Sequence, residues 1–424
     1  MTSQAPVDQP ARRGAPLIIA ATVIAGIAGY AVTFLVLRFV GAAAYAVFAA
    51  FWAAMYLIVG GVSGVQQEIA RATHPIAFGS RNRPNKARNF ALITAGALFV
   101  LILVTSPAWA PFVFRADGEA LVVPLAVGTS SYVLVATLSG ALYGLSQWRS
   151  IFLMIITDGL LRLIFVLIVF IFTRDILWIA WAAALPLPLT IALLWRFIRP
   201  GLVGRSELDV GYRDLTWNVA RTVLASISTA ALVSGFPLIL AVAGKSASAT
   251  YVGHLIFAIT ITRAPLIVTV MALQSFFVVH FRENGRSSGR TLGLALGVLL
   301  LGGVLLATLA WWIGPSILNW LFGESGGIGS EFVTILVISS AMVAGLTVTG
   351  SAVLARSRHF VYSFGWVMAA ITTILLMSLP IALTVRIESA LLAGPVVGLL
   401  FHCVWLGWYA RRHSASDVPQ QMKG

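Results

Sequence analysis

The stretch YVGHLIFAITITRAPLIVTVMALQSFFVVHF, residues 251–281, is apolar and long enough to cross a bilayer, and it carries Arg263 near its midpoint. A helix needs about 20 apolar residues to span the hydrocarbon core. An unpaired guanidinium at mid-bilayer costs at least about 2.5 to 3.5 kcal/mol, so we expect Arg263 to face a bundle interior or a watery cavity. Pro265 removes a helical hydrogen bond, which predicts a kink beside the charge. A bent, charged membrane helix is a candidate transport site.

The rest of the chain has the composition of a polytopic membrane protein. Hydrophobic residues make up 59% of it and charged residues 10%, and the mean hydropathy is +0.95. These values exclude a soluble globular protein. Apolar segments recur between short polar breaks and predict about twelve membrane-spanning helices. The predicted spans run at about 17–37, 45–65, 90–109, 120–145, 151–172, 176–195, 217–242, 251–281, 291–313, 331–354, 360–383 and 389–409.

The most polar internal segment, residues 200–216, divides these spans into two groups of equal size. We therefore expect an all-α protein with a tail at 1–16, an N-terminal six-helix lobe at 17–199, a linker at 200–216, a C-terminal six-helix lobe at 217–410 and a tail at 411–424.

The net charge of +14 follows this topology. Most Lys and Arg residues fall on the side of both termini and the linker. The opposite side receives only Arg38, Arg115, Arg174, Lys245 and Arg386. By the positive-inside rule both termini are expected in the cytoplasm. Cys403 is the single cysteine, which excludes a disulfide framework and thiolate metal sites. We expect neither a metal nor another cofactor.

Similar residues occur in the same order in the two halves of the sequence, as expected of a duplicated helical bundle. Gly41 precedes Tyr45 in the first half, and Gly244 precedes Tyr251 in the second. Gln66 closes the second span, and Gln274 lies near the end of the eighth. The shared order favours a duplication in which both halves start on the same side of the membrane.

Four segments carry a resemblance to a known family: 41–51, 61–67 with Arg71, 140–150 and 244–257. Through them the sequence resembles the Wzx-like oligosaccharide-lipid flippases of the multidrug/oligosaccharidyl-lipid/polysaccharide exporter superfamily. The resemblance implies two six-helix lobes, as in MATE transporters and flippases, with a cleft that opens alternately to either side. It also implies a polyprenyl-(pyro)phosphate-linked sugar as substrate, in cell-envelope polysaccharide biosynthesis at the cytoplasmic membrane. The sequence departs from the family's cationic cleft because its first span has no Lys or Arg before Arg38.

Embedded charges supply the candidate substrate-binding residues. A guanidinium matches phosphate oxygens with paired donors, so Arg263 is expected to bind an anionic headgroup, with Arg162 or Arg221 helping. Asp158 and Arg162 lie four residues apart on one helical face, where they form a structural pair or separate during transport. Arg221 lies one turn inside its helix and is also able to snorkel to the interface.

Polar side chains at helix ends complete the candidate set. Gln66 and Gln274 offer donors and acceptors for sugar hydroxyls. His254 and His402 are expected to be satisfied structural residues. The expected partners are the lipid-linked glycan, membrane lipids and glycan-assembly membrane enzymes, with no nucleic acid.

Two other functions stay open at this point. The first is an ion-coupled exporter of small amphipathic or cationic compounds, although three embedded arginines against one aspartate disfavour a cationic substrate. The second is a membrane scaffold for glycan synthases. An enzyme is not expected, because the sequence has no Walker glycine-lysine loop and no long outer loop rich in carboxylates.

Overall fold

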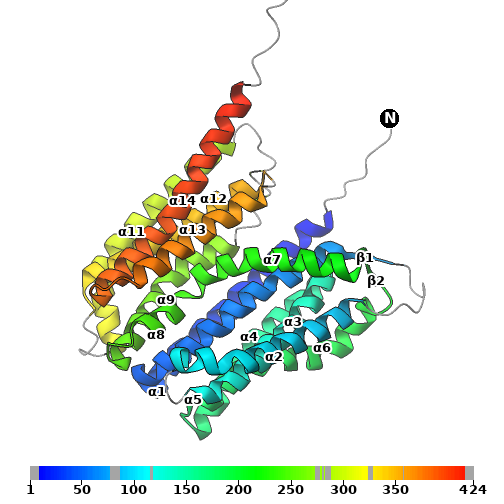
Figure 1. Cartoon of the computed structure of the whole chain (residues 1–424), viewed down its shortest axis with the longest axis horizontal. Coiled ribbons are helices and arrows are strands. Elements are labelled where there is room, and N and C mark those ends of the chain that lie inside the picture. The colour runs from blue at the N-terminus through cyan, green and yellow to red at the C-terminus, as the bar shows by residue number, and fades with distance from the viewer. Residues whose placement is uncertain are drawn as a thin grey trace, which may run out of the picture. The chain divides into compact units, whose positions relative to one another are not determined.

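The computed structural model describes residues 9–76, 86–114, 118–272, 277–278, 281, 288–322, 328–356 and 358–415 (Figure 1). Contacts divide the chain into two units, Met1–Phe257 and Ala258–Gly424. The predicted lobe boundaries at 199 and 217 stay a prediction.

Long helices form almost all of the first unit. They are α1 (Gln9–Ala72), α2 (Lys86–Phe114), the 3-10 helix η1 (Glu119–Leu121), α3 (Val122–Gly144), α4 (Trp148–Phe172), α5 (Ile176–Ala184), α6 (Pro186–Leu202), α7 (Tyr212–Val233) and α8 (Phe236–Ala243). The first unit also contains two short strands, β1 (Thr73–Pro75) and β2 (Ser206–Leu208). Helix α9 (Ala249–Ala272) begins in the first unit. The second unit contains α11 (Ser288–Phe322), α12 (Ser330–Leu354), α13 (His359–Met377) and α14 (Leu383–Ala415).

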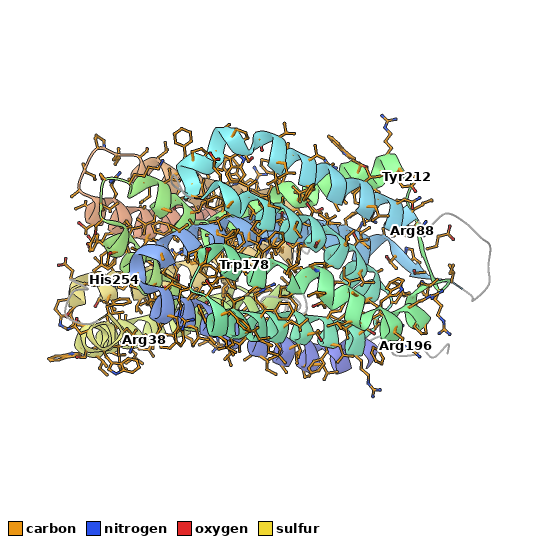
Figure 2. The ribbon with its side chains drawn as sticks, turned by 90° about the horizontal axis from the view of Figure 1, so that it is seen from below. Arg38, Arg88, Trp178, Arg196, Tyr212 and His254 are labelled. Carbon is orange, nitrogen blue, oxygen red and sulfur yellow. The ribbon has the colours of Figure 1, made fainter. Side chains whose placement is uncertain are left out.

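These helices confirm the predicted all-α polytopic fold. Within the described ranges, 9 helices are long and apolar enough to cross a membrane, or 10 if the bent pair α7 and α8 forms one span. Each predicted span overlaps one or two described helices, with both of the first two on α1, while the end of the span predicted at 251–281 lies partly outside the described residues. In the first unit, Figure 2 shows Arg88, Arg196 and Tyr212 at one end and Arg38 and His254 at the other. The helices therefore run between two opposite ends, as membrane spans must.

Helix α1 contains the first two predicted spans, which meet at a kink that lies between them. The backbone bends at Gly41, whose φ of 80° and ψ of 164° lie in a region that favours glycine. Helix α9 packs against this bend, since a Cβ on Gly253 would lie 2.0 Å from the carbonyl oxygen of Ala42. The rings of Tyr45 and Phe257 meet edge to face, with centroids 5.7 Å apart. The bend at Gly41 therefore contacts α9, so the two segments that carry the predicted repeat lie against each other.

Two further helices end differently from their predictions. The predicted span at 217–242 is broken at Ser234 and Gly235, with 62° between α7 and α8. Pro237 lies in the first turn of α8, where its missing N–H is tolerated. The predicted span at 360–383 ends early, at Met377, because Pro380 cannot continue a helix.

The predicted linker at 200–216 contains a strand that sequence patterning did not reveal. Strand β2 pairs with β1 in antiparallel register, with Thr73 opposite Leu208. The pairing extends outward because Asp209 donates its backbone N–H to the carbonyl of Ala72 at 3.0 Å. Leu208 is 6% exposed and joins an apolar cluster that includes Ile69 of α1. Strand pairing and the burial of Leu208 therefore hold this segment against the end of α1.

Helices α1 and α7 approach closely through small residues. A Cβ on Gly60 would lie 2.5 Å from the Cβ of Ala230. A Cβ on Gly64 would lie 2.5 Å from the backbone nitrogen of Val223, and the carbonyl of Gly64 accepts a 3.0 Å hydrogen bond from the hydroxyl of Thr222. Small residues allow such backbone contact between membrane helices, where apolar burial alone provides little drive for association.

Candidate functional site

An arginine, an aspartate and two aromatic residues come together between α1 and α4. We call these residues, Trp52, Tyr56, Asp158 and Arg162, the Arg162 cluster. Asp158 and Arg162 share one face of α4 because they lie one turn apart. The opposite face is apolar and exposed, as Leu160 shows with 40% exposure. The pattern of α4 is therefore that of a lipid-facing helix with charges turned toward α1.

The guanidinium of Arg162 is held from two sides. Its Nη2 donates to both carboxylate oxygens of Asp158 at 2.9 Å, and its Nη1 donates to the hydroxyl of Tyr56. The central guanidinium carbon lies 5.6 Å from the ring centroids of both Trp52 and Tyr56. The two rings lie one turn apart on α1, with centroids 5.0 Å apart. Hydrogen bonds and cation–π contacts thus replace the water that the charge loses.

Burial is unequal within the pair. The side chain of Arg162 is 6% exposed, and that of Asp158 is 25% exposed. The Nε atom of Arg162 is buried and has no hydrogen-bond partner among the described residues. The pair therefore has an accessible carboxylate edge and a buried guanidinium.

Close packing fixes the helices that carry the cluster. A Cβ on Gly159 would lie 2.9 Å from the Cα of Ala25, so α4 touches the first half of α1 at the backbone. Arg162 contacts the second half of the same helix through Tyr56. The bend at Gly41 allows α1 to bring both halves against α4.

The predicted site residues do not all gather in one place. The pairing of Asp158 with Arg162 is confirmed. Arg263 lies in the second unit on α9 and is 6% exposed, which confirms the expectation that it avoids lipid. Arg221 is exposed, and its guanidinium lies 5.5 Å from the ring centroid of Trp217, as expected of a residue that reaches the interface.

The two glutamines contribute less to the described site. Gln66 is half-buried at the end of α1, and its side chain has no hydrogen bond to another described residue. Gln274 lies outside the described residues. Sequence analysis missed Trp52 and Tyr56, although their four-residue spacing places both rings on one helical face.

The buried histidine His402 is satisfied, as expected. Its Nδ1 lies 3.3 Å from the hydroxyl of Thr349, and its Nε2 lies 3.3 Å from the carbonyl of Tyr362. In the part of the chain that the structure describes, no group of three His, Cys, Asp or Glu side chains is arranged to hold a metal ion.

Similar proteins share most of the length of this chain. No family model matches the sequence. Uncharacterized protein Rv3630 of Mycobacterium tuberculosis is 30% identical over 396 residues, which cover 91% of this chain and 90% of that protein. Uncharacterized protein Rv1510 of the same species is 31% identical over 412 residues, covering 94% and 92%.

Solved structures of transporters share its fold. An inward-facing multidrug-resistance MATE family transporter of the MOP superfamily matches with a TM-score of 0.67 and 15% identity, covering 94% of this chain and 99% of that one. A MOP superfamily transporter from Pyrococcus furiosus, described as having a binding pocket of reverse polarity that suggests a different function, matches with a TM-score of 0.60 and 14% identity, covering 95% and 96%. The chain is therefore a multi-pass membrane protein that belongs to the same family as Rv3630 and Rv1510, and it has the fold of the MATE transporters.

Proposed function

We propose that the chain is a transporter that moves a polyprenyl-(pyro)phosphate-linked sugar or oligosaccharide across the cytoplasmic membrane by alternating access. The observation that carries the proposal is the buried guanidinium of Arg162, whose counter-ion Asp158 stays partly accessible. The fold supports transport, and the resemblance to Wzx-like flippases supports the substrate class. Both termini are proposed to lie in the cytoplasm.

The sign of the embedded charge favours an anionic substrate. Arg162 and Arg263 are both buried, while Asp158 is the carboxylate that pairs with the first of them. An ionisable residue inside a membrane protein is a functional-site hypothesis by default, because its insertion is costly. The buried guanidinium groups of Arg162 and Arg263 suit a phosphate better than a cation, since the buried carboxylate of Glu68 is already paired with Arg71 at the end of α1. The solved MOP transporter described as having reverse pocket polarity supports the view that this fold serves substrates of different charge.

Ligand exchange at Arg162 provides a binding step. A phosphate approaching the accessible edge of Asp158 competes for Nη2, while Tyr56 keeps Nη1 in place. Phosphate presents oxygens to the planar guanidinium in the same paired geometry as a carboxylate does. The displaced Asp158 then carries an uncompensated charge, which favours a conformation that hydrates it. Substrate binding is thereby linked to a change of state.

Reconstitution tests this function. The protein is placed in liposomes that contain a fluorescent polyprenyl-phosphate sugar, and a membrane-impermeant quencher reports the fraction in the outer leaflet over time. We expect wild type to accelerate movement between leaflets, and Arg162→Ala to slow it to the rate of protein-free liposomes. The matched control is Arg196→Ala, since Arg196 is exposed at the end of α6 (Figure 2).

Three outcomes would contradict the proposal. Equal rates for wild type and Arg162→Ala would remove Arg162 from the site. Movement of a cationic dye, but not of the lipid, would favour the ion-coupled exporter. No movement of either substrate, together with binding to glycan-assembly membrane enzymes, would favour a scaffold.

A further inference from the structure

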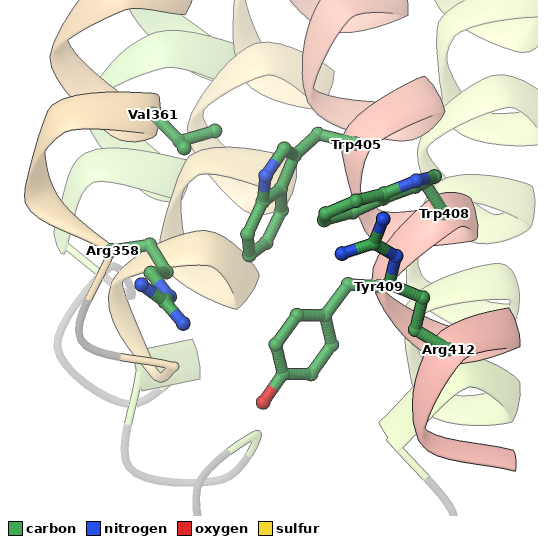
Figure 3. Close-up of a pocket in the computed structure, with 6 residues that line it drawn as sticks. All are labelled: Arg358, Val361, Trp405, Trp408, Tyr409 and Arg412. Atoms are coloured by element: carbon green, nitrogen blue, oxygen red, sulfur yellow. The ribbon is translucent and has the colours of Figure 1, made fainter. Parts of the chain in front are cut away.

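A pocket of about 300 Å³ opens between the start of α13 and the end of α14 (Figure 3). Its lining residues are Arg358, Val361, Trp405, Trp408, Tyr409 and Arg412. None of them belongs to α1, α4 or α9, the helices that carry the Arg162 cluster and Arg263. The pocket is therefore built from other helices than those that carry the proposed transport residues.

Two arginines, and no carboxylate among the described residues, line the pocket. In Figure 3, Arg358, which directly precedes α13, and Arg412 on α14 lie on either side of the Tyr409 ring. Both side chains are exposed, and neither lies within salt-bridge distance of a described Asp or Glu. The guanidinium of Arg412 lies 4.0 Å from the ring centroid of Trp408. The aromatic ring orients this charge while leaving its donors available.

The remaining lining residues are Val361 and three aromatic residues near the end of the candidate membrane span on α14. Trp405 and Tyr409 are stacked, with ring centroids 5.2 Å apart. The span on α14 ends at Arg412, and Trp408 is 47% exposed at the same end. Trp and Tyr collect where helices leave the hydrocarbon core, and Arg side chains reach from there to the headgroups. The composition of the pocket thus matches that of helix ends at the depth of lipid headgroups.

We propose that this pocket binds the phosphodiester headgroup of an anionic phospholipid of the surrounding bilayer. Arg358 and Arg412 would hold the phosphate oxygens, and the aromatic walls would pack against the glycerol and the upper acyl chains. A free inorganic anion would gain nothing from those walls. The charge distribution predicts this end of the helices to be cytoplasmic, where anionic lipids attract basic groups.

Lipid titration of the purified full-length protein tests the proposal. Bound lipids are counted by native mass spectrometry with phosphatidylglycerol or with phosphatidylcholine of the same acyl chains. We expect wild type to retain a phosphatidylglycerol molecule at lipid concentrations where phosphatidylcholine is lost. The variant Arg358→Ala/Arg412→Ala is expected to bind that molecule about tenfold more weakly, equivalent to about 1.4 kcal/mol.

A charge-matched control separates a built site from general attraction. Arg196→Ala/Arg411→Ala removes the same charge from exposed positions outside the pocket and should bind like wild type. Arg358→Lys/Arg412→Lys keeps the charge, and partial recovery is expected because Lys lacks the planar fork. Glycerol phosphate at millimolar concentration should not displace the lipid.

Four results would overturn the proposal. The first is equal retention of both lipids by wild type, and the second is an equal loss of phosphatidylglycerol binding in the pocket variant and in the charge-matched control. The third is full phosphatidylglycerol binding by Arg358→Ala/Arg412→Ala. The fourth is displacement of the lipid by glycerol phosphate. The last result would identify a site for free phosphate esters.

Discussion

Asp158 and Arg162 lie one turn apart on α4, and one guanidinium nitrogen donates to both carboxylate oxygens at 2.9 Å. This geometry neutralises two charges within one membrane helix. It also leaves the two residues unequal, because the carboxylate is more exposed than the guanidinium. If the pair only stabilised the fold, removing both charges together would leave transport intact. If Arg162 binds the substrate, transport requires the guanidinium even when the fold is stable.

The first prediction separates these two roles. Asp158→Asn leaves a buried charge without its partner, and the free energy of unfolding should fall by about 3 to 5 kcal/mol. The double variant Asp158→Asn/Arg162→Gln removes both charges and should recover most of that loss. Thermal unfolding in detergent measures stability, and the liposome assay measures transport. We expect the double variant to be stable and inactive. An active double variant would show that the pair is purely structural.

A second prediction concerns the hydroxyl that holds the guanidinium from α1. Tyr56→Phe removes the acceptor of Nη1 and leaves a buried donor unmatched, at a cost of about 1 to 3 kcal/mol. Transport should decrease, because Arg162 is then free to reorient. Tyr143→Phe is the control, since the Tyr143 hydroxyl has no hydrogen bond to a described residue. A similar loss in both variants would mean that Tyr56 contributes only packing.

The third prediction tests the contact between α1 and α7. Gly64→Ala forces a Cβ to within 2.6 Å of the carbonyl carbon of Thr222, so the helices must separate. We expect a lower unfolding temperature and weaker transport. Gly29→Ala on the same helix meets nothing within 4 Å and should be neutral or slightly stabilising. An unchanged unfolding temperature for Gly64→Ala would show that these helices do not pack closely.

The fourth prediction tests whether the linker is ordered. Leu208 is buried against α1, so Leu208→Ser should release β2 and speed tryptic cleavage after Arg205. The matched control Val203→Ser alters a side chain that is 42% exposed and should leave the cleavage rate unchanged. Rapid cleavage of the wild-type protein at the same bond would contradict the pairing of β1 with β2.

Hydropathy predicted the helices well because membrane spans must be long and apolar, whatever their neighbours are. It failed where backbone geometry decides, at the break beside Gly235. Residue spacing predicted the pairing of Asp158 with Arg162, because both lie on one helix. It could not reveal Tyr56, whose contribution depends on the packing of α1 against α4. The three-residue strand β2 was equally invisible, since it is too short to show alternation.

The most direct test of the central claim is the leaflet distribution of lipid-linked glycans in cells depleted of this protein. A membrane-impermeant sugar probe is applied to intact cells and to inverted vesicles. The account predicts accumulation on the cytoplasmic leaflet, rescued by wild type and Arg196→Ala but by neither Arg162→Ala nor Arg263→Ala. An unchanged distribution in depleted cells would contradict the account, and rescue by both embedded-arginine variants would contradict the proposed site.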